Sequence, residues 1–178
     1  PGTTPGELVL SVDEATGIQA LERIADDLPI GPGKPRAREF EYTRHGTQTL
    51  IAGINVATGK VQGICGETRT EEDLVWHFHT LIQADPEAGW VIVVDNLNVH
   101  CSESLVRWVA RLEGIDESTL GRKGKSGILK SMTTRREFLE DRSHRVRFVF
   151  TPKHSSWLNQ IEVVFGIVYR RAIARASF

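Results

Sequence analysis

Two short apolar runs, each ending on an aspartate, constrain the fold more strongly than any other feature of this sequence. The first is ELVLSVD at residues 7–13, and the second is WVIVVD at residues 90–95. Both are too brief for a helix and mostly apolar, which is typical of strands buried on both faces of a sheet. Ligand sites in α/β sheets tend to lie at the carboxyl ends of such strands. Asp13 and Asp95 are therefore candidate functional residues.

The rest of the sequence predicts an α/β fold, with a mixed sheet flanked by helices. Two further β-like runs are joined by the turn signal Ala57-Thr58-Gly59 and should pair antiparallel. Thr70 and Ser102 can cap helices, because their hydroxyls accept hydrogen bonds from the first helical turn. In chain order we expect strands at residues 7–13, 47–55 and 60–65, a helix after Thr70, a strand at 90–94, a helix after Ser102, a strand at 146–150, and a final helix capped by Ser155 or Ser156.

The expected final helix carries a third acidic candidate, Glu162. A glycine inside a helix costs about 1 kcal/mol of stability, so Gly166, four residues later, suggests clearance for a ligand beside that carboxylate. Helical spacing predicts a core-facing ridge made of Leu158, Ile161, Phe165 and Val168. It predicts an adjoining stripe of small and polar residues made of Ser155, Asn159, Glu162 and Gly166.

Asp13, Asp95 and Glu162 are residues of the type that holds hard divalent cations. Three carboxylates brought together repel one another and gain protons unless cations neutralise them. Oxygen ligands without clustered His or Cys favour Mg²⁺ or Mn²⁺ over Zn²⁺. Two such ions would activate the attacking oxygen and stabilise the leaving oxygen at a phosphodiester. The alternative, from pattern alone, is that a strand-end aspartate caps a turn or is simply solvated.

The composition is that of an ordinary globular domain, and it limits the possible function classes. The 178 residues carry 22 Lys+Arg against 23 Asp+Glu, a formal charge of −1, and are 40% hydrophobic and 25% charged. A wholly electrostatic nucleic-acid binder would have a basic excess, so any such contact must be local. Residues 1–178 are expected to form a single domain. No apolar run approaches the ~18–20 residues of a membrane-spanning helix, so no membrane partner is expected.

The termini and the cysteines predict a cytoplasmic fragment of a longer protein. The chain starts at Pro1, and PGTTPG has neither the charge nor the apolar stretch of a signal peptide. Cys65 and Cys101 are too few for a disulfide framework and lack metal-knuckle spacing, which indicates a reducing compartment. Two buried thiols are the expected structural outcome.

One stretch is basic in an otherwise near-neutral chain. Residues 114–145 are glycine-rich and charged without a strand signal, and we interpret them as an insertion or long connection. No acid occurs from Gly121 to Arg136. The cations of this segment are the best candidates for contacts with DNA phosphates, and a solvated, flexible loop is the alternative. They are Arg122, Lys123, Lys125, Lys130, Arg135 and Arg136.

Three motifs cover the two aspartates and the third acid: VDEATGIQALER at residues 12–23, VDNLNVH at 94–100 and TPKHSSWLNQIE at 151–162. In this order they resemble the DDE catalytic domain of insertion-sequence transposases of the IS630 group, within the Tc1/mariner superfamily. The resemblance spans nearly the whole chain, and GKSGILKSM in the basic stretch resembles an insertion in one branch of that group. It implies a ribonuclease-H-like fold, with the mixed five-stranded sheet flanked by helices.

The resemblance also implies an enzyme that cuts and joins double-stranded DNA at transposon ends. Asp13 and Asp95 match the first two catalytic aspartates and Glu162 matches the third acidic position, so the three would hold two ions of Mg²⁺ or Mn²⁺. A homodimer acting on paired ends and a bacterial source are further implications. The family's helix-turn-helix region, which recognises transposon ends, would precede Pro1 and is absent from residues 1–178.

Polar residues near the three acids are candidates for hydrogen bonds to the carboxylates, to water or to DNA. Those after the second aspartate could equally form a polar loop that caps the next helix. The site-adjacent candidates are Asn96, Asn98, His100, His154 and Asn159.

Two other functions stay open from the sequence. The same fold in a decayed element could hold DNA or a partner without cutting it. Another ribonuclease-H-like nuclease, acting on RNA–DNA hybrids or junctions, is the third possibility. The presence of all three acids favours the transposase.

Overall fold

The computed structural model of the chain describes residues 6–24, 31–33 and 41–174, and its elements follow the predicted order. The strands are β1 (Glu7–Arg23), β2 (Tyr42–Asn55), β3 (Val61–Gly66), β4 (Gly89–Val94) and β5 (Val146–Phe150). The α-helices are α1 (Glu71–Ile82), α2 (Glu103–Leu112), α3 (Met132–Leu139) and α4 (Ile161–Val168), and α4 continues into a π-helical turn at Tyr169–Ile173. Among these described residues, no helix is both long and apolar enough to cross a membrane.

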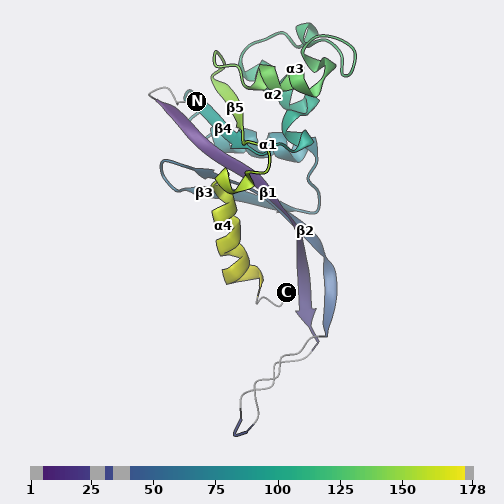
Figure 1. The fold of residues 1–178 in the computed structure, drawn as a ribbon, viewed down its shortest axis with the longest axis vertical. Coiled ribbons are helices and arrows are strands. Elements are labelled where there is room, and N and C mark those ends of the chain that lie inside the picture. The colour runs from purple at the N-terminus through teal and green to yellow at the C-terminus, as the bar shows by residue number, and fades with distance from the viewer. Residues whose placement is uncertain (1–5, 25–30, 34–40, 175–178) are drawn as a thin grey trace.

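The strands form one mixed sheet, in the order β3-β2-β1-β4-β5 (Figure 1). β1 pairs antiparallel with β2 and parallel with β4, while β4 pairs parallel with β5 and β2 pairs antiparallel with β3. The predicted α/β class and the five-stranded mixed sheet are confirmed. Because β1 and β4 run parallel, the residues that follow their pairing lie at the same edge of the sheet.

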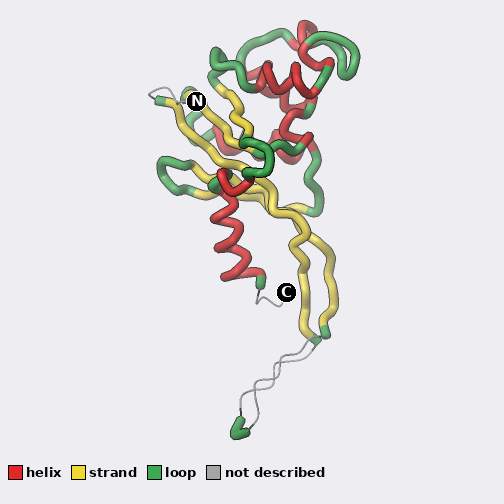
Figure 2. Tube along the Cα trace, viewed as in Figure 1, coloured by secondary structure: helices red, strands yellow, loops and turns green. Residues whose placement is uncertain are grey.

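β1 is longer than predicted and does not end at Asp13. Its parallel pairing with β4 stops at Ser11 opposite Val93, whereas its antiparallel pairing with β2 continues to Arg23 opposite Tyr42. The outer halves of β1 and β2 therefore leave the sheet as a two-stranded ribbon (Figure 2). Polar residues after Asp13 break the apolar pattern, but backbone pairing needs no apolar side chains. Asp13 thus lies where β1 separates from β4.

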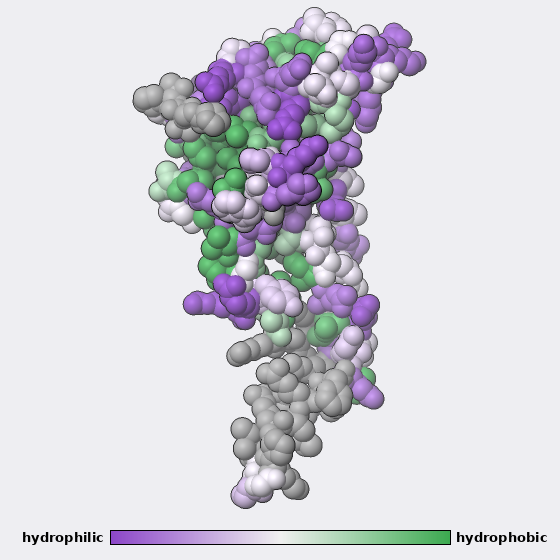
Figure 3. All heavy atoms as spheres, in the orientation of Figure 1, coloured by the Kyte–Doolittle hydropathy of each residue, from purple (hydrophilic) through white to green (hydrophobic). Residues whose placement is uncertain are grey.

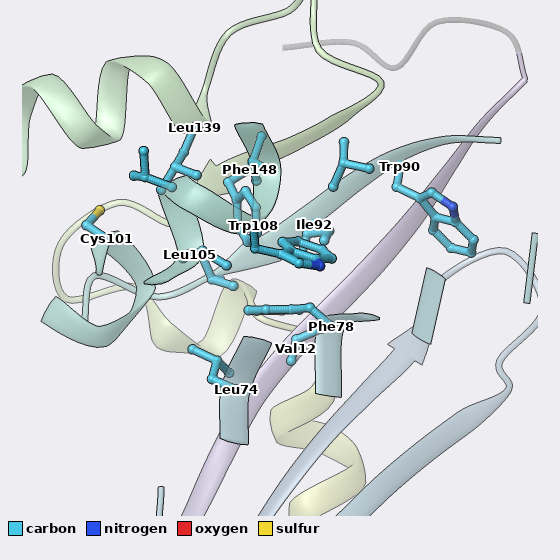
Figure 4. Close-up of a cluster of buried hydrophobic side chains, with 14 of the residues drawn as sticks. Val12, Leu74, Phe78, Trp90, Ile92, Cys101, Leu105, Trp108, Leu139 and Phe148 are labelled. Carbon is cyan, nitrogen blue, oxygen red and sulfur yellow. The ribbon is translucent and has the colours of Figure 1, made fainter. Parts of the chain in front are cut away.

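One face of the sheet carries the main hydrophobic core. Leu10 and Val12 of β1 point to this face and are almost completely buried. Phe78 of α1 lies between two other aromatic rings, with its centroid 6.1 Å from that of Trp108 and 5.3 Å from that of Phe148 (Figure 4). The residues of β1 between the core positions alternate to the opposite face, where α4 lies.

The stretch at 114–145 is ordered and belongs to the core. It forms two 3-10 turns, Glu117–Leu120 and Ile128–Lys130, followed by α3. Leu120, Leu129 and Leu139 are fully buried in the main cluster. Three leucines at irregular spacing give no periodic signal, which is why the sequence predicted only a connection.

The final helix starts later than predicted. Residues Ser156–Leu158 form a separate 3-10 turn, and α4 begins at Ile161 with Gln160 as its N-cap, so the assignment of Ser155 or Ser156 as the cap is wrong. Leu158, expected on the core-facing ridge, is 44% exposed, while Asn159 is completely buried. The break between the two helical segments rotates residue 159 inward, where it has polar partners.

The two cysteines differ in environment. Cys101 is buried, and burial raises the pKa of its thiol to about 11, whereas Cys65 on the edge strand β3 is exposed. Both are free. The expectation of two buried thiols is therefore right for Cys101 and wrong for Cys65, because an edge strand with a solvated face leaves its outer side chains uncovered.

Candidate active site

Asp13 is a buried carboxylate with a fixed orientation. Strand alternation places it, with Ser11, on the face of β1 that meets α4, and its exposed fraction is 5%. Its Oδ1 accepts the backbone N–H of Glu14 at 2.8 Å, and its Oδ2 accepts the side-chain N–H of Asn159 at 3.2 Å. Burial, together with the negative charges of Asp95 and Glu14, raises the pKa of Asp13 to about 7. A carboxylate with this pKa is stabilised by any cation that binds beside it.

Asp95 follows β4 directly and is more accessible. Its side chain is 24% exposed, and its Oδ1 accepts the backbone N–H of Leu97 at 2.9 Å and contacts His100 Nδ1 at 2.8 Å. Burial alone would raise the pKa of Asp95, but the hydrogen bonds from His100 and Leu97 outweigh it and hold that pKa below its usual value. Asp95 is therefore an ionised carboxylate beside Asp13, at the edge where β1 and β4 separate.

Asn159 ties the segment before α4 to β1. Its side chain donates to the carbonyl of Val12 at 2.9 Å and to Asp13, and its Oδ1 accepts the hydroxyl of Ser11. The Ser11 hydroxyl in turn accepts the backbone N–H of Ile161 at 2.9 Å, at the start of α4. The predicted role of Asn159 beside the acids is thus matched by a direct contact with Asp13. Since Asn159 and Ile161 are fully buried, this clamp fixes the first turn of α4.

Glu162 lies in that first turn but is not gathered with the two aspartates. Its side chain is exposed, and it borders a groove of about 770 Å³ between α4 and the ribbon of β1 and β2. Gly166 borders the same groove, although a Cβ added there would lie 3.2 Å from Arg170 Nη1. Within residues 6–24, 31–33 and 41–174, no group of three or more His, Cys, Asp and Glu side chains is arranged to hold a metal. The structure thus brings Asp13 and Asp95 together and leaves Glu162 at the rim.

His100 joins the site to the hydrophobic core. It is fully buried, with Nδ1 facing Asp95 and Nε2 lying 3.4 Å from Glu14 Oε1. Burial opposes its protonation, but the contacts with Asp95 and Glu14 outweigh burial and raise the pKa of His100 to about 9. His77 of α1, also near Glu14, stays neutral, since burial lowers its pKa to about 4. The buried ring of His100 therefore lies between the carboxylates of Asp95 and Glu14, on the core side of the site.

The other site-adjacent candidates have different surroundings. Asn96 donates to the carbonyl of Thr151 at 2.6 Å and accepts a hydrogen bond from Arg136 at 2.9 Å, so it joins the segments that follow β4 and β5. Asn98 is exposed at the start of the 3-10 turn Asn98–Cys101. His154 is exposed and has a left-handed backbone, with a φ of 62°.

The six basic candidates fall into two groups. Arg135 is buried and donates to the carbonyl of Cys101 at 2.8 Å, and Arg136 covers the ring of Phe150 at 4.3 Å, so both serve the packing of α3. The other four are exposed, and Lys123 lies 3.9 Å from Glu71. Figure 3 shows hydrophilic residues gathered over the end of the molecule that carries α3. The exposed group is Arg122, Lys123, Lys125 and Lys130.

Sequence reasoning missed two residues of the site, Ser11 and Glu14. Both residues depart from the apolar pattern of a buried strand. Ser11 is a small polar residue within it, and Glu14 lies on the same strand face as Leu10 and Val12. An acid on a core-facing position must find a partner, because an unpaired buried charge is costly. That partner, His100, is distant in sequence.

The residues present fit a hard divalent cation. The available donors are carboxylate oxygens, and the charge of Asp13 is disfavoured by burial and by Asp95. Glu162 lies three positions after Asn159, whose hydrogen bond to Asp13 holds this segment against β1. A bound cation would relieve the repulsion between Asp13 and Asp95.

The fold and this edge define the class to which the protein belongs: it has the ribonuclease-H-like fold, with carboxylates where two parallel strands separate. Residues 9–178 match the DDE superfamily endonuclease family, and the chain belongs to that family. The predicted family is thereby confirmed at the level of the DDE superfamily. No match was found among curated protein sequences.

Solved structures match the chain at low sequence identity, and the first of them shares its fold. The Mos1 mariner paired end complex with Mn contains a chain that is 14% identical, with a TM-score of 0.56, over 96% of this chain and 43% of that chain. A simian T-cell lymphotropic virus intasome in complex with the PP2A regulatory subunit B56 gamma matches at 9% identity and a TM-score of 0.45, over 97% of this chain and 44% of that chain. The chain therefore spans less than half the length of these solved chains.

Proposed function

We propose that this chain is the catalytic core of a metal-dependent DNA transposase of the IS630 group, which hydrolyses phosphodiesters at transposon ends and joins the ends to a target. The observation that carries the proposal is that Asp13 and Asp95 lie near enough to interact electrostatically where β1 and β4 separate, with Glu162 on the helix anchored to the same strand. Membership of the DDE superfamily endonuclease family supports it. So does the likeness in fold to a mariner protein solved as a paired end complex with Mn.

Asp13, Asp95 and Glu162 are the residues that would hold Mg²⁺ or Mn²⁺, as two ions. When bound, the metal neutralises phosphate charge and makes water or a 3′-hydroxyl a better nucleophile. Leu97 and His100 hold one oxygen of Asp95, Oδ1, and leave the other for the site, while Asn159 keeps Asp13 turned toward the same edge. Glu162, in the first turn of α4, would complete the set of carboxylates.

The test is cleavage of DNA by the whole chain with Mn²⁺. Asp13→Asn and Asp95→Asn should reduce nicking of a supercoiled plasmid to the level seen without metal, because each removes a carboxylate of the site. Glu87→Gln changes an exposed acid in the turn before β4 and should cut like the parent chain. Full activity in either aspartate variant would contradict the assignment. Cutting only hybrid or junction substrates would instead indicate another ribonuclease-H-like nuclease.

Double-stranded DNA is the proposed partner, contacted by Arg122, Lys123, Lys125 and Lys130. Removing one side chain that neutralises a phosphate should lower the slope of log affinity against log salt by about 0.9. Replacing Arg122, Lys123 and Lys125 with Ser should therefore flatten the salt dependence of DNA binding. Lys60→Ser, in the turn between β2 and β3, is the matched control, and equal slopes in the two variants would argue against this surface.

A second candidate function is favoured by the position of Glu162. Since this acid is exposed and apart from the aspartates, the chain could hold DNA or a partner without cutting it. DNA binding with a normal salt slope, but no metal-dependent nicking by the parent chain, would support this candidate. A homodimer on paired ends, in bacterial cytoplasm, completes the transposase proposal.

A further inference from the structure

The orientation of Asp95 depends on donors in the short segment that follows it. Both donors found for this carboxylate, the Leu97 N–H and His100, meet the same oxygen, Oδ1. Within the described residues, no hydrogen bond reaches Oδ2. Asp95 therefore has one committed oxygen and one oxygen open to a ligand.

His100 can act as that donor only while its ring is held in place. The side chain is completely buried within the 3-10 turn Asn98–Cys101, and its second nitrogen lies 3.4 Å from Glu14. Nε2 has no hydrogen-bond partner among the described residues, but turning Nδ1 away from Asp95 would separate Nε2 from its 3.4 Å contact with Glu14 inside a fully buried site. This resembles the outer partners of metal sites, which fix the orientation of a ligand through its far side.

Glu14 is in an unusual position for a carboxylate. Its side chain is 1% exposed, and it lies on the core-facing side of β1, next to Asp13 in sequence but on the opposite face. No Lys or Arg pairs with it among the described ion pairs, and its Oε2 has no hydrogen-bond partner. A buried carboxylate costs stability unless a partner compensates it, and the ring of His100, with Nε2 3.4 Å from Glu14 Oε1, is the partner placed to do so.

We propose that His100, held by Glu14, is a positioning residue that orients Asp95 so that one carboxylate oxygen is committed and the other is presented to the site. The inference rests on the proposed metal-dependent function, which it extends by two residues. Neither His100 nor Glu14 touches the reacting atoms. Both act through Asp95.

Two substitutions of His100 separate positioning from packing. An asparagine side chain places its N–H where the Nδ1 of histidine lies and can still donate to Asp95, but it cannot reach Glu14. A glutamine places its N–H near the Nε2 position and can reach Glu14, but not Asp95. Glutamine is the closer match in size, so a packing role would favour His100→Gln, whereas a positioning role favours His100→Asn.

The first readout is Mn²⁺ affinity of the whole chain, measured from free Mn²⁺ by electron paramagnetic resonance. Loss of an outer-shell partner commonly weakens metal binding about 10- to 100-fold, which is the effect expected for His100→Gln. His100→Asn should recover most of the affinity, and Glu14→Gln should be intermediate. His144→Gln removes another buried histidine, away from the site, and should bind Mn²⁺ like the parent chain.

The second readout needs neither metal nor DNA. In the chain labelled with ¹⁵N-histidine, the His100 Nδ1–H should exchange slowly with water, far more slowly than the ring protons of the exposed His79. Asp95→Asn should shift this signal strongly, and Glu14→Gln should speed its exchange. Because no histidine is replaced, these variants also report on the pairing of His100 with Asp95 if His100 variants fail to fold.

The outcomes distinguish this inference from the proposed function. Weak Mn²⁺ binding by His100→Gln with recovery in His100→Asn supports it, and equal affinity in both variants and the parent chain overturns it. If the parent chain binds no Mn²⁺, the metal-dependent function fails, and the exchange rate of the Nδ1–H still decides the positioning role. Rapid exchange in the parent chain would overturn the positioning role even if DNA cleavage is observed.

Discussion

The two faces of the sheet are built in different ways. On one face, α1, α2 and the 114–145 stretch enclose a continuous core with Phe78 and Trp90 fully buried. On the other face, α4 meets β1 through Ile161 and the polar clamp of Asn159, while its outer residues stay in solvent. The aspartates belong to the rigid part, since their strands are packed firmly from the core side. Glu162 lies on the polar, less covered face, and its side chain is exposed although the clamp anchors the first turn of its helix.

The largest effect on stability is expected for Phe78→Ala, which tests how tightly the core face of the sheet is packed. Removing a fully buried phenylalanine from a closed core typically costs about 3–5 kcal/mol, because the neighbouring rings of Trp108 and Phe148 cannot refill the space. Urea denaturation should show a loss of this size in the free energy of unfolding. A loss of under about 1 kcal/mol would mean that the core face yields easily, and the contrast between the faces would fail.

The clamp should give the next largest effect. Asn159→Leu removes the donors to Val12 and Asp13 and leaves the Ser11 hydroxyl without its acceptor, and an unsatisfied buried polar group costs about 1–3 kcal/mol. We expect a loss in that range, with amide hydrogen exchange accelerated in α4 but unchanged in α2. Equal acceleration in both helices would show that Asn159 supports the whole fold rather than α4.

The pH dependence of the free energy of unfolding tests whether burial disfavours the charge of Asp13. The pKa of Asp13 is about 7 in the folded chain and 3.8 in the reference state, so between these values the folded state holds a proton that the unfolded state has released. The free energy of unfolding contributed by Asp13 therefore falls as pH rises from about 4 to about 7, by up to about 1.4 kcal/mol per pH unit.

His77 acts in the opposite direction. Its folded pKa of about 4 lies below its reference value of 6.5, so its contribution rises with pH over much of the same range. The Asp13 effect is isolated by subtracting the curve of Asp13→Asn from that of the parent chain. Denaturation at several pH values supplies both curves, and parallel curves would mean that Asp13 is not strained by burial.

The smallest effect is expected on the outer face of α4. Val163 is 64% exposed, and surface substitutions of this kind stay within about 0.5 kcal/mol. Val163→Ser should therefore leave the midpoint of urea unfolding nearly unchanged. A loss above about 1 kcal/mol would contradict the view that this surface is solvated.

Local pattern predicted much of the fold, and the roles of Asp13, Asp95 and Glu162 stay predictions. The helix caps at Thr70 and Ser102 and the strand before Asp95 depend on neighbouring residues, and the structure places them as expected, whereas β1 continues past Asp13. The start of α4 was misplaced, because its position depends on the contacts of Asn159 with Ser11 and Val12. The partnership of Glu14 with His100 was missed for the same reason.

The polar contacts of Asn159 with β1 also limit when this part of the chain can fold during synthesis. Ser11 and Asn159 are separated by 148 positions, and Asp13 and Asn159 by 146. Chains leave the ribosome from the N-terminus, so β1 is made long before the residue that covers its polar edge. A nascent chain therefore cannot complete this edge until Asn159 has emerged, and the two aspartates are translated well ahead of the segment that anchors the third acid.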